Sequence, residues 1–227
     1  MKENSINSKK EDCWYREVCT QDCEWSCIRY LEMSYLMDNS GIPKAKQKPI
    51  DLYPNDIDYD EFVRLSQIKQ HIDTFVKDGK NLYITSATTG NGKTSWAIKL
   101  LLKYFDKVWA GNGFKVRGYF VHVPTLLLNL KDFDNPNTDI HRIKKILLET
   151  DVVIWDDIAS TEISKYDYSQ LLMLIDNRTF ENKSNIYTGN INSLDKLRKV
   201  LGDKLSSRIW SLSEVIEFKG KDRRNEY

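Results

Sequence analysis

The sequence lacks several features that would each indicate a particular class of protein. Its three histidines, His71, His122 and His141, are scattered and do not have the spacing of metal ligands. No apolar run approaches the roughly 18 residues that are needed to cross a bilayer. Residues 1–13 lack the apolar core of a signal peptide. We therefore expect no histidine-ligated metal centre and no membrane partner, and we expect the protein to stay in the cytoplasm.

A large excess of charge is also missing, because 34 basic residues stand against 33 acidic residues and the formal net charge is +1. Such a protein does not coat nucleic acid through its overall charge, so any contact with DNA or RNA must come from a local patch. The length of 227 residues, with a hydrophobic share of 41%, suits one domain with a real core plus a small appendage.

Cysteine is absent after residue 27, yet four cysteines lie close together before that point: Cys13, Cys19, Cys23 and Cys27. In the cytoplasm their thiols are expected to stay reduced. Four thiolates can close a tetrahedral zinc site, and Cys19, Cys23 and Cys27 would share one face if they lay on a helix. Zinc is the favoured interpretation. An iron–sulfur cluster, which also takes four cysteines, and four metal-free thiols on a helix face are the alternatives.

The composition divides the chain into three parts. Residues 1–40 are predicted to be a cysteine-rich module that binds a metal and a partner, with an amphipathic helix that ends near Gly41. Residues 41–58 contain three prolines and no clear period, which is typical of a linker that lies over a domain surface. Their basic run, residues 44–48, is interpreted as solvated linker rather than as a contact to nucleic-acid phosphate. Residues 59–227 form the main domain.

The main domain alternates between short apolar runs and amphipathic segments. A helix over residues 59–77 has its apolar residues on one face. Strands are expected over residues 81–86, 117–123, 151–157, 184–190 and 213–218. Further helices are expected over residues 93–105, 125–133, 138–150, 166–182, 193–201 and 203–210. This alternation predicts an α/β fold in which helices cover both faces of a parallel sheet.

The segment "TTGNGKTS" lies between the strand at 81–86 and the following helix. Gly90 and Gly92 let the backbone turn tightly and direct its N–H groups inward, and the positive end of the helix points to the same place. Lys93 can reach the outer phosphates of a nucleotide, and the Thr94 hydroxyl can ligate magnesium. The residues predicted to bind the nucleotide are Thr88, Thr89, Gly90, Asn91, Gly92, Lys93, Thr94 and Ser95.

Ala87 stands where the usual phosphate-loop pattern begins with glycine. Alanine adds one methyl group and disfavours a positive φ, so it is tolerable if this residue has ordinary strand-end angles. A glycine-rich turn with a chance lysine is the alternative, and the agreement of strand, loop and helix argues against it.

Two later strands are expected to end in polar residues. Asp156 and Asp157 follow a buried apolar strand, and Asn190 follows the strand at 184–190. In a nucleoside triphosphatase the acidic strand is expected beside the phosphate-loop strand, where Asp156 holds magnesium and Asp157 positions or deprotonates the attacking water. Asn190 would orient the same water. A helix N-cap for the acids and a turn for Asn190 are the alternative roles.

These motifs resemble those of the AAA+ ATPases, and more closely those of the DnaC/DnaI-type helicase loaders, including versions carried by bacteriophages. The resemblance covers about residues 80–227 and rests on "TTGNGKTS", "VVIWDDI", "IDNRTFENKSNIYTGN", "LGDKLSSRI" and "FKGKDRR". It implies that Asn190 is the first sensor and Arg208 an arginine finger. It also implies that Arg224, favoured over Arg223, is the second sensor.

Two further features bear on the resemblance. Asp157 stands where many AAA+ proteins have glutamate, although some replication ATPases use two aspartates. The chain ends soon after the second-sensor segment, so no separate lid domain is expected, which is typical of these loaders. Loaders of the DnaI type also carry an N-terminal zinc module that engages the helicase, which supports zinc by analogy.

The resemblance implies a slow, switch-like ATPase that uses ATP and magnesium. The cysteine-rich module would bind a replicative DNA helicase, and the protein would help to place that ring on single-stranded DNA, assembling with itself or on the ring. Three alternatives stay open. An IstB-like transposition ATPase is disfavoured by the cysteine module. A P-loop small-molecule kinase does not need the paired acids, the polar strand tip and the terminal arginine together. A non-hydrolysing adaptor with a degenerate site is the third.

Overall fold

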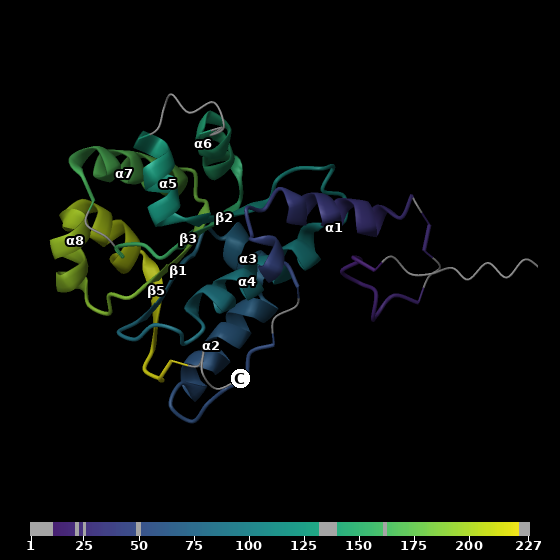
Figure 1. The fold of residues 1–227 in the computed structure, drawn as a ribbon, viewed down its shortest axis with the longest axis horizontal. Coiled ribbons are helices and arrows are strands. Elements are labelled where there is room, and N and C mark those ends of the chain that lie inside the picture. The colour runs from purple at the N-terminus through teal and green to yellow at the C-terminus, as the bar shows by residue number, and fades with distance from the viewer. Residues whose placement is uncertain are drawn as a thin grey trace, which may run out of the picture.

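The fold is given by a computed structural model that describes residues 11–20, 23–24, 26–48, 51–131, 140–160 and 163–222. A sheet of five strands has helices on both faces (Figure 1). The strands are β1 (Asn81–Ser86), β2 (Gly118–His122), β3 (Val152–Asp156), β4 (Ser184–Gly189) and β5 (Ser213–Phe218). The helices are α1 (Ile28–Asp38), η1 (Lys44–Lys46), α2 (Tyr59–Gln70), α3 (Ile72–Lys77), α4 (Lys93–Val108), α5 (Val123–Lys131), α6 (Ile140–Glu149), α7 (Lys165–Phe180), α8 (Leu194–Ser206) and η2 (Ser207–Ser211). The expected α/β fold is confirmed.

Neighbouring strands of the sheet run parallel, in the order β2-β3-β4-β1-β5. The expectation that the acidic strand β3 lies beside the phosphate-loop strand β1 is wrong, because β4 pairs with both of them and lies between them. Alternation of strands and helices along a sequence does not fix the order in which strands pair. The carboxyl ends of β1, β4 and β3 still meet at one edge of the sheet, which is where open α/β sheets bind ligands.

Side chains of each strand alternate between two separate cores. On β1, Leu82 and Ile84 belong to the core shared with α1, α2, α3 and α4, whereas Tyr83 belongs to the core shared with α5, α6, α7 and α8. On β3, Ile154 and Trp155 divide in the same way. All five side chains are fully buried. Strands buried on both faces therefore appear in the sequence as continuous apolar runs, as in other parallel sheets.

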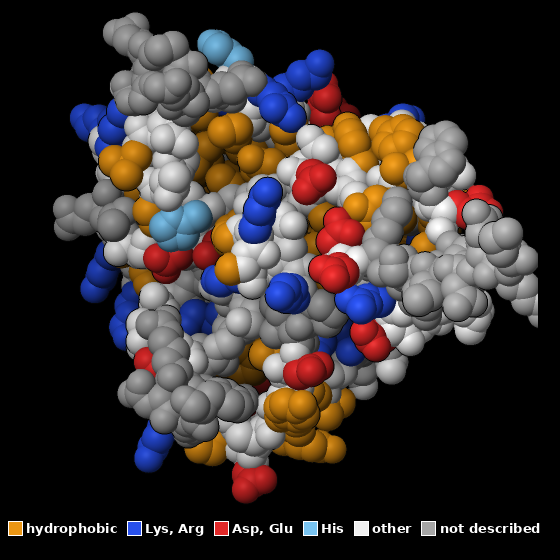
Figure 2. All heavy atoms as spheres, turned by 45° about the vertical axis from the view of Figure 1, so that its right-hand side comes forward, with side chains coloured by type: hydrophobic (Ala, Val, Ile, Leu, Met, Phe, Trp, Pro, Cys, Tyr) orange, Lys and Arg blue, Asp and Glu red, His pale blue; other side chains and the backbone are white. Residues whose placement is uncertain are grey.

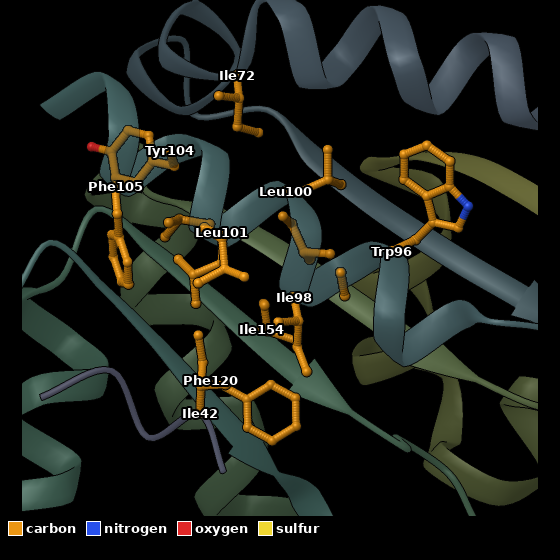
Figure 3. Close-up of a cluster of buried hydrophobic side chains, with 14 of the residues drawn as sticks. Ile42, Ile72, Trp96, Ile98, Leu100, Leu101, Tyr104, Phe105, Phe120 and Ile154 are labelled. Atoms are coloured by element: carbon orange, nitrogen blue, oxygen red, sulfur yellow. The ribbon is translucent and has the colours of Figure 1, made fainter. Parts of the chain in front are cut away.

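Helix α4 packs against the sheet through its apolar face (Figure 3). Three fully buried side chains of α4 point toward the sheet, on the face that carries Ile154: Ile98, Leu101 and Phe105. Burial of such a side chain contributes about 1.5–3 kcal/mol relative to leaving it exposed. Because the phosphate loop leads directly into α4, this packing holds the end of the loop at a fixed place on the sheet.

The segment expected as one helix over residues 59–77 is two helices. His71 ends α2 and precedes α3, with φ −112° and ψ 30°. The break changes the direction of the chain, so that α2 contacts β5 while α3 contacts β4. The expected interruption between residues 201 and 203 is confirmed, because Gly202 has non-helical angles within α8.

The described residues before α1 pack against the C-terminal end of α4. Tyr15 is buried in the first core, and its hydroxyl donates to Asp106 Oδ1 at 2.9 Å. Burial and the nearby Asp106 carboxylate keep the pKa of Tyr15 above its ordinary value, so the hydroxyl remains a donor. The Arg29 guanidinium lies 4.3 Å from the centre of the Tyr15 ring. The division at residue 40 stays a prediction.

No helix in the described part of the chain is long and apolar enough to cross a membrane.

Candidate functional site

A cavity of about 370 Å³ opens at the carboxyl ends of β1, β3 and β4. Its size is within the usual range for small-molecule sites. The residues that line it are Lys46, Thr89, Gly90, Asn91, Gly92, Lys93, Thr94, Ser95, His122, Asp156, Asp157, Thr188 and Asn190. The structure thus brings the predicted phosphate loop, the paired acids and the polar strand tip into one cavity. Thr88 was predicted to bind nucleotide and is not among the lining residues.

The backbone of the phosphate loop needs its two glycines but not a third. Gly90 and Gly92 have φ of +73° and +93°, a region that favours glycine. A Cβ on Gly90 would lie 1.8 Å from Asp222 Oδ1, so the Asp222 side chain would have to move to make room for it. Ala87 does not have a positive φ and is exposed. Its extra methyl group is therefore not strained by a left-handed backbone conformation.

A network of hydrogen bonds within the loop holds it around Lys93. The Lys93 ammonium donates to Thr88 O at 2.9 Å and to Asn91 Oδ1 at 3.0 Å. The Asn91 amide in turn donates to Ser86 Oγ, at the end of β1, and to Thr88 Oγ1. Lys93 and Asn91 are largely buried. Asn91 thus fixes the loop shape, and Lys93 places a positive charge inside the loop where a phosphate would lie.

Thr94 and Asp156 come together in the cavity although they are far apart in the sequence. Thr94 Oγ1 donates to Asp156 Oδ1 at 2.7 Å, and Thr188 Oγ1 donates to the same oxygen at 2.7 Å. Hydroxyl and carboxylate oxygens are the hard ligands that magnesium prefers. This donor set therefore fits the predicted magnesium site. Thr188, on β4, was not predicted, and it is the residue that links the two strands at this point.

Asp157 has an unusual backbone conformation that directs its side chain into the cavity. Its φ is +59°, a left-handed conformation that aspartate adopts more readily than most residues. The surroundings hold it there, because the Asp157 N–H donates to Thr188 Oγ1 at 3.0 Å and the Ile158 N–H donates to Thr188 O at 2.8 Å. Such strained residues concentrate at functional sites. The Asp157 carboxylate is 37% exposed and is accessible to a water molecule.

Asn190 lines the cavity just after β4, and the loop that carries it is fixed from β1. The carbonyl of the next residue, Ile191, accepts hydrogen bonds from Tyr83 Oη and Thr85 Oγ1, both at 2.8 Å. Burial raises the pKa of Tyr83 to about 12, so its hydroxyl stays protonated and donates. These hydrogen bonds therefore fix the loop that carries Asn190, the predicted first sensor, at the carboxyl edge of the sheet.

Arg208 lies away from the cavity, on η2. Its Nε donates to Asp176 Oδ1 of α7 at 2.5 Å, and the two side chains are 38% and 27% exposed. The family resemblance implies an arginine finger at Arg208, and this residue does not line the cavity of its own chain. The predicted second sensor, Arg224, and its alternative, Arg223, lie outside the described residues.

The segment after β5 lies against the phosphate loop and is held by a buried acid. Thr88 Oγ1 donates to Gly220 O at 2.9 Å. The Asp58 carboxylate, which is 1% exposed, accepts from the N–H groups of Lys219 and Gly220 at 2.7 and 3.1 Å. Thr88 and Asp58 thus position this segment beside the loop. No pattern in the sequence identified Asp58, because its partners are backbone groups far along the chain.

Two further residues of the cavity were not assigned to it from the sequence. His122 ends the edge strand β2, with its Nε2 3.9 Å from Asp157 Oδ2. The rule that identified Asn190, a polar residue at a strand end, would also have identified His122. Lys46 was interpreted as part of a solvated linker, yet it lines the cavity. Its position depends on the path of the linker, which the sequence does not show.

The four cysteines do not gather around one point. Cys27 directly precedes α1, and Cys19 and Cys23 lie in non-helical backbone, so the condition for a shared helix face is not met. Cys19 and Cys27 line one hollow, whereas Cys13 lines another. Among the described residues, no group of three or more metal-ligating side chains is placed to hold an ion. The thiols as they lie here do not fit a four-thiolate zinc site.

The surface carries charges of both signs. On the face shown in Figure 2, lysine and arginine side chains are interspersed with aspartate and glutamate side chains among the described residues. This mixture agrees with the near-zero net charge. On this face the described residues therefore form no continuous basic surface.

Comparisons with known proteins give a family and several structures of similar fold. The family described as "IstB-like ATP binding protein" matches residues 44–226. The crystal structure of the DnaC helicase loader is 23% identical, with 74% of this chain and 94% of that chain covered and a TM-score of 0.62. The structure of DnaI is 22% identical, with 81% and 94% covered and a TM-score of 0.61.

A putative primosome component from Streptococcus pyogenes serotype M3 is 19% identical, with 84% of this chain and 98% of that chain covered and a TM-score of 0.60. At these identities the likeness concerns the fold. No curated protein matches the sequence. The family match, by contrast, extends over most of the chain and includes every residue that lines the cavity. The chain belongs to the IstB-like family of ATP-binding proteins and is an ATPase with the AAA+ fold.

Proposed function

We propose that the protein is an ATP-dependent helicase loader, which binds a replicative DNA helicase and helps to place it on single-stranded DNA. The main support is the fold: this chain covers 94% of the DnaC structure and 94% of the DnaI structure. A cavity at the sheet edge that joins the phosphate loop, the paired acids and Asn190 adds to that support. The loader activity itself, the helicase partner and the contact to DNA are proposals.

The cavity residues suggest how nucleotide is bound. The N–H groups of the loop and the Lys93 ammonium bind the phosphates, and the positive end of α4 points at them. Thr94 and Asp156 hold magnesium, which neutralises charge on the phosphates when it is bound. The hydrogen bond from Thr188 to Asp156 keeps this carboxylate facing Thr94. Nucleotide binding thus uses groups at the ends of β1, β4 and β3, which are already joined through Asp156 and Thr188.

Hydrolysis is assigned to Asp157 and Asn190. Asp157 accepts a proton from the attacking water or orients that water, and its partly exposed carboxylate leaves room for this task. Asn190 orients the same water from the tip of β4. The cavity of one chain lacks a contribution from Arg208, so the reaction is completed by Arg208 of a neighbouring subunit. Hydrolysis then depends on assembly, which suits a release switch.

An IstB-like transposition ATPase is the second candidate, and the description of the matching family favours it. Such a protein would act with a transposase on duplex DNA. The two candidates share the nucleotide site and differ in the partner. A capture experiment with purified partners therefore separates them.

The capture prediction concerns the surface before and at the start of α1. Val18 and Ile28 are 73% and 56% exposed and line one hollow. We expect a purified replicative helicase to be captured by the unchanged protein, and a Val18→Asp, Ile28→Asp double variant to lose capture, because charges would enter an apolar contact. Phe180→Asp, at a residue on α7 that is 79% exposed, is the matched control and should capture normally.

These substitutions avoid the buried residues of α1, which removal of residues 1–40 would take out of the core. ATP binding by both variants, measured by titration, should equal that of the unchanged protein. Normal capture of helicase by the double variant would contradict the assignment of this surface. Capture of a transposase in place of helicase would support the second candidate.

Zinc binding by Cys13, Cys19, Cys23 and Cys27 stays a prediction. In the described structure the thiols are apart, so a single zinc site requires residues 13–27 to rearrange around the metal. Elemental analysis of protein purified without chelator should give about one zinc per chain, because a structural site takes four ligands. Iron together with visible absorbance would indicate an iron–sulfur cluster instead of a zinc site. Protein that contains neither metal would contradict both interpretations.

A further inference from the structure

We propose that Lys46, supplied by the linker, binds the outermost phosphate of ATP, so that the linker completes the nucleotide site. The inference rests on the proposed arrangement of phosphates and magnesium in the cavity. It does not depend on whether the partner is a helicase or a transposase. The first observation is direct: Lys46 lines the same cavity as Lys93, Thr94 and the paired acids.

The path of the linker brings Lys46 to the cavity from one defined side. The Phe120 N–H of β2 donates to Ser40 O at 2.7 Å, so the chain after α1 runs beside the outer edge of the sheet. Gly41 makes this approach possible. Its φ is +70°, and a Cβ there would lie 2.4 Å from Phe120 O. The linker therefore reaches the carboxyl end of the sheet at the β2 side.

A set of hydrogen bonds fixes the turn that carries Lys46. Gln47 Nε2 donates to Met37 O at 3.1 Å and to Ile42 O at 2.9 Å. The Lys46 N–H donates to Pro43 O at 2.7 Å within η1. Ile42 is 4% exposed and belongs to the first core. The backbone at Lys46 is therefore anchored on both sides, and only its side chain extends freely toward the cavity.

The linker reaches the cavity at its β2 side, and this determines which end of a bound phosphate chain Lys46 would contact. The order of the sheet places β2 next to β3, on the opposite side of β4 from β1. His122 ends β2 and Asp156 ends β3, and they are register partners. Lys46 therefore approaches the acidic end of the cavity, where the reacting phosphate and its magnesium would lie. A cation there is placed for the terminal phosphate, which ATP has and ADP lacks.

The charge of Lys46 is available for this role. No ion pair or side-chain hydrogen bond of Lys46 occurs within the described ranges. A lysine ammonium is a compact point charge with three donors, which suits a phosphate oxygen. Its neighbours in the basic run differ from it, because Lys44 and Lys48 line a separate hollow beside Cys13. Lys44 and Lys48 can therefore serve as controls for substitutions of Lys46.

The experiment measures binding of a non-hydrolysable ATP analogue and of ADP, with magnesium, to the full chain. Lys46→Ala should weaken binding of the analogue by about tenfold, the scale of one hydrogen bond between charged groups. Binding of ADP should change little. Lys46→Arg should restore part of the affinity for the analogue, because the charge is retained. Lys44→Ala should bind both nucleotides as the unchanged protein does.

Lys93→Ala separates failure of this inference from failure of the nucleotide site. If Lys93→Ala abolishes binding while Lys46→Ala binds the analogue normally, Lys46 is a solvated linker residue and the inference is wrong. Equal losses for Lys44→Ala and Lys46→Ala would also overturn it, because they would show a general charge effect. If the unchanged protein does not bind the analogue, both the inference and the proposed site are contradicted.

Discussion

Arg208→Ala is expected to lower ATP hydrolysis by the assembled protein about 10³-fold or more, while ATP binding stays unchanged. Arg208 does not line the cavity of its own chain, so any action on phosphate must reach a neighbouring subunit. A guanidinium suits that task because it stays charged and its planar fork can neutralise charge that develops on the phosphate. The assay needs assembly conditions, with helicase and single-stranded DNA present.

A structural role for Arg208 predicts a different pattern, and Asp176 provides the control. The two side chains form a partly exposed ion pair, which is worth about 0–1 kcal/mol of stability. Asp176→Asn removes the charge of this partner and keeps an acceptor oxygen. If Arg208 is a finger, Asp176→Asn should hydrolyse ATP at nearly the normal rate. If the ion pair is what matters, Asp176→Asn should be as inactive as Arg208→Ala.

Mixing two inactive variants tests whether Arg208 acts between subunits. Asp157→Asn should lower hydrolysis about 10²–10⁴-fold, because it removes the general base of its own site. It keeps Arg208, and Arg208→Ala keeps Asp157. In mixed assemblies some interfaces join an intact site to an intact finger, so part of the activity should return. Mixed assemblies that form and show no hydrolysis would exclude a finger acting in trans.

The sequence predicted those parts of the site that depend on local pattern. The loop from Thr89 to Ser95 and the paired acids follow from residue types at the ends of strands, and parallel strands end together. The tolerance of Ala87 also follows from local backbone angles. Asp157 was placed correctly in the cavity, although its left-handed conformation was not foreseen, because that conformation depends on the bonds of Thr188 and Ile158 to the neighbouring strand.

The parts that the sequence did not predict depend on long-range pairing. The position of β4 between β1 and β3 depends on how all the strands of the sheet pair with one another. Lys46 and Asp58 belong to a linker without a period, and their roles come from its path along β2 and beside Gly220. The cysteine spacing suggested a helix face, but α1 begins after Cys27. Regular spacing indicates a shared face only where the helix extends through it.

The most direct test of the loader proposal is the loading of a purified replicative helicase onto closed circular single-stranded DNA. A closed circle has no end onto which a ring can thread, so loading requires that the ring be opened. With ATP and this protein, unwinding of a strand annealed to the circle should rise well above that of helicase alone. Lys93→Ala should leave unwinding at the level of helicase alone, because the variant does not bind ATP. If the unchanged protein binds ATP and helicase yet does not increase unwinding from closed circles, the protein is not a helicase loader.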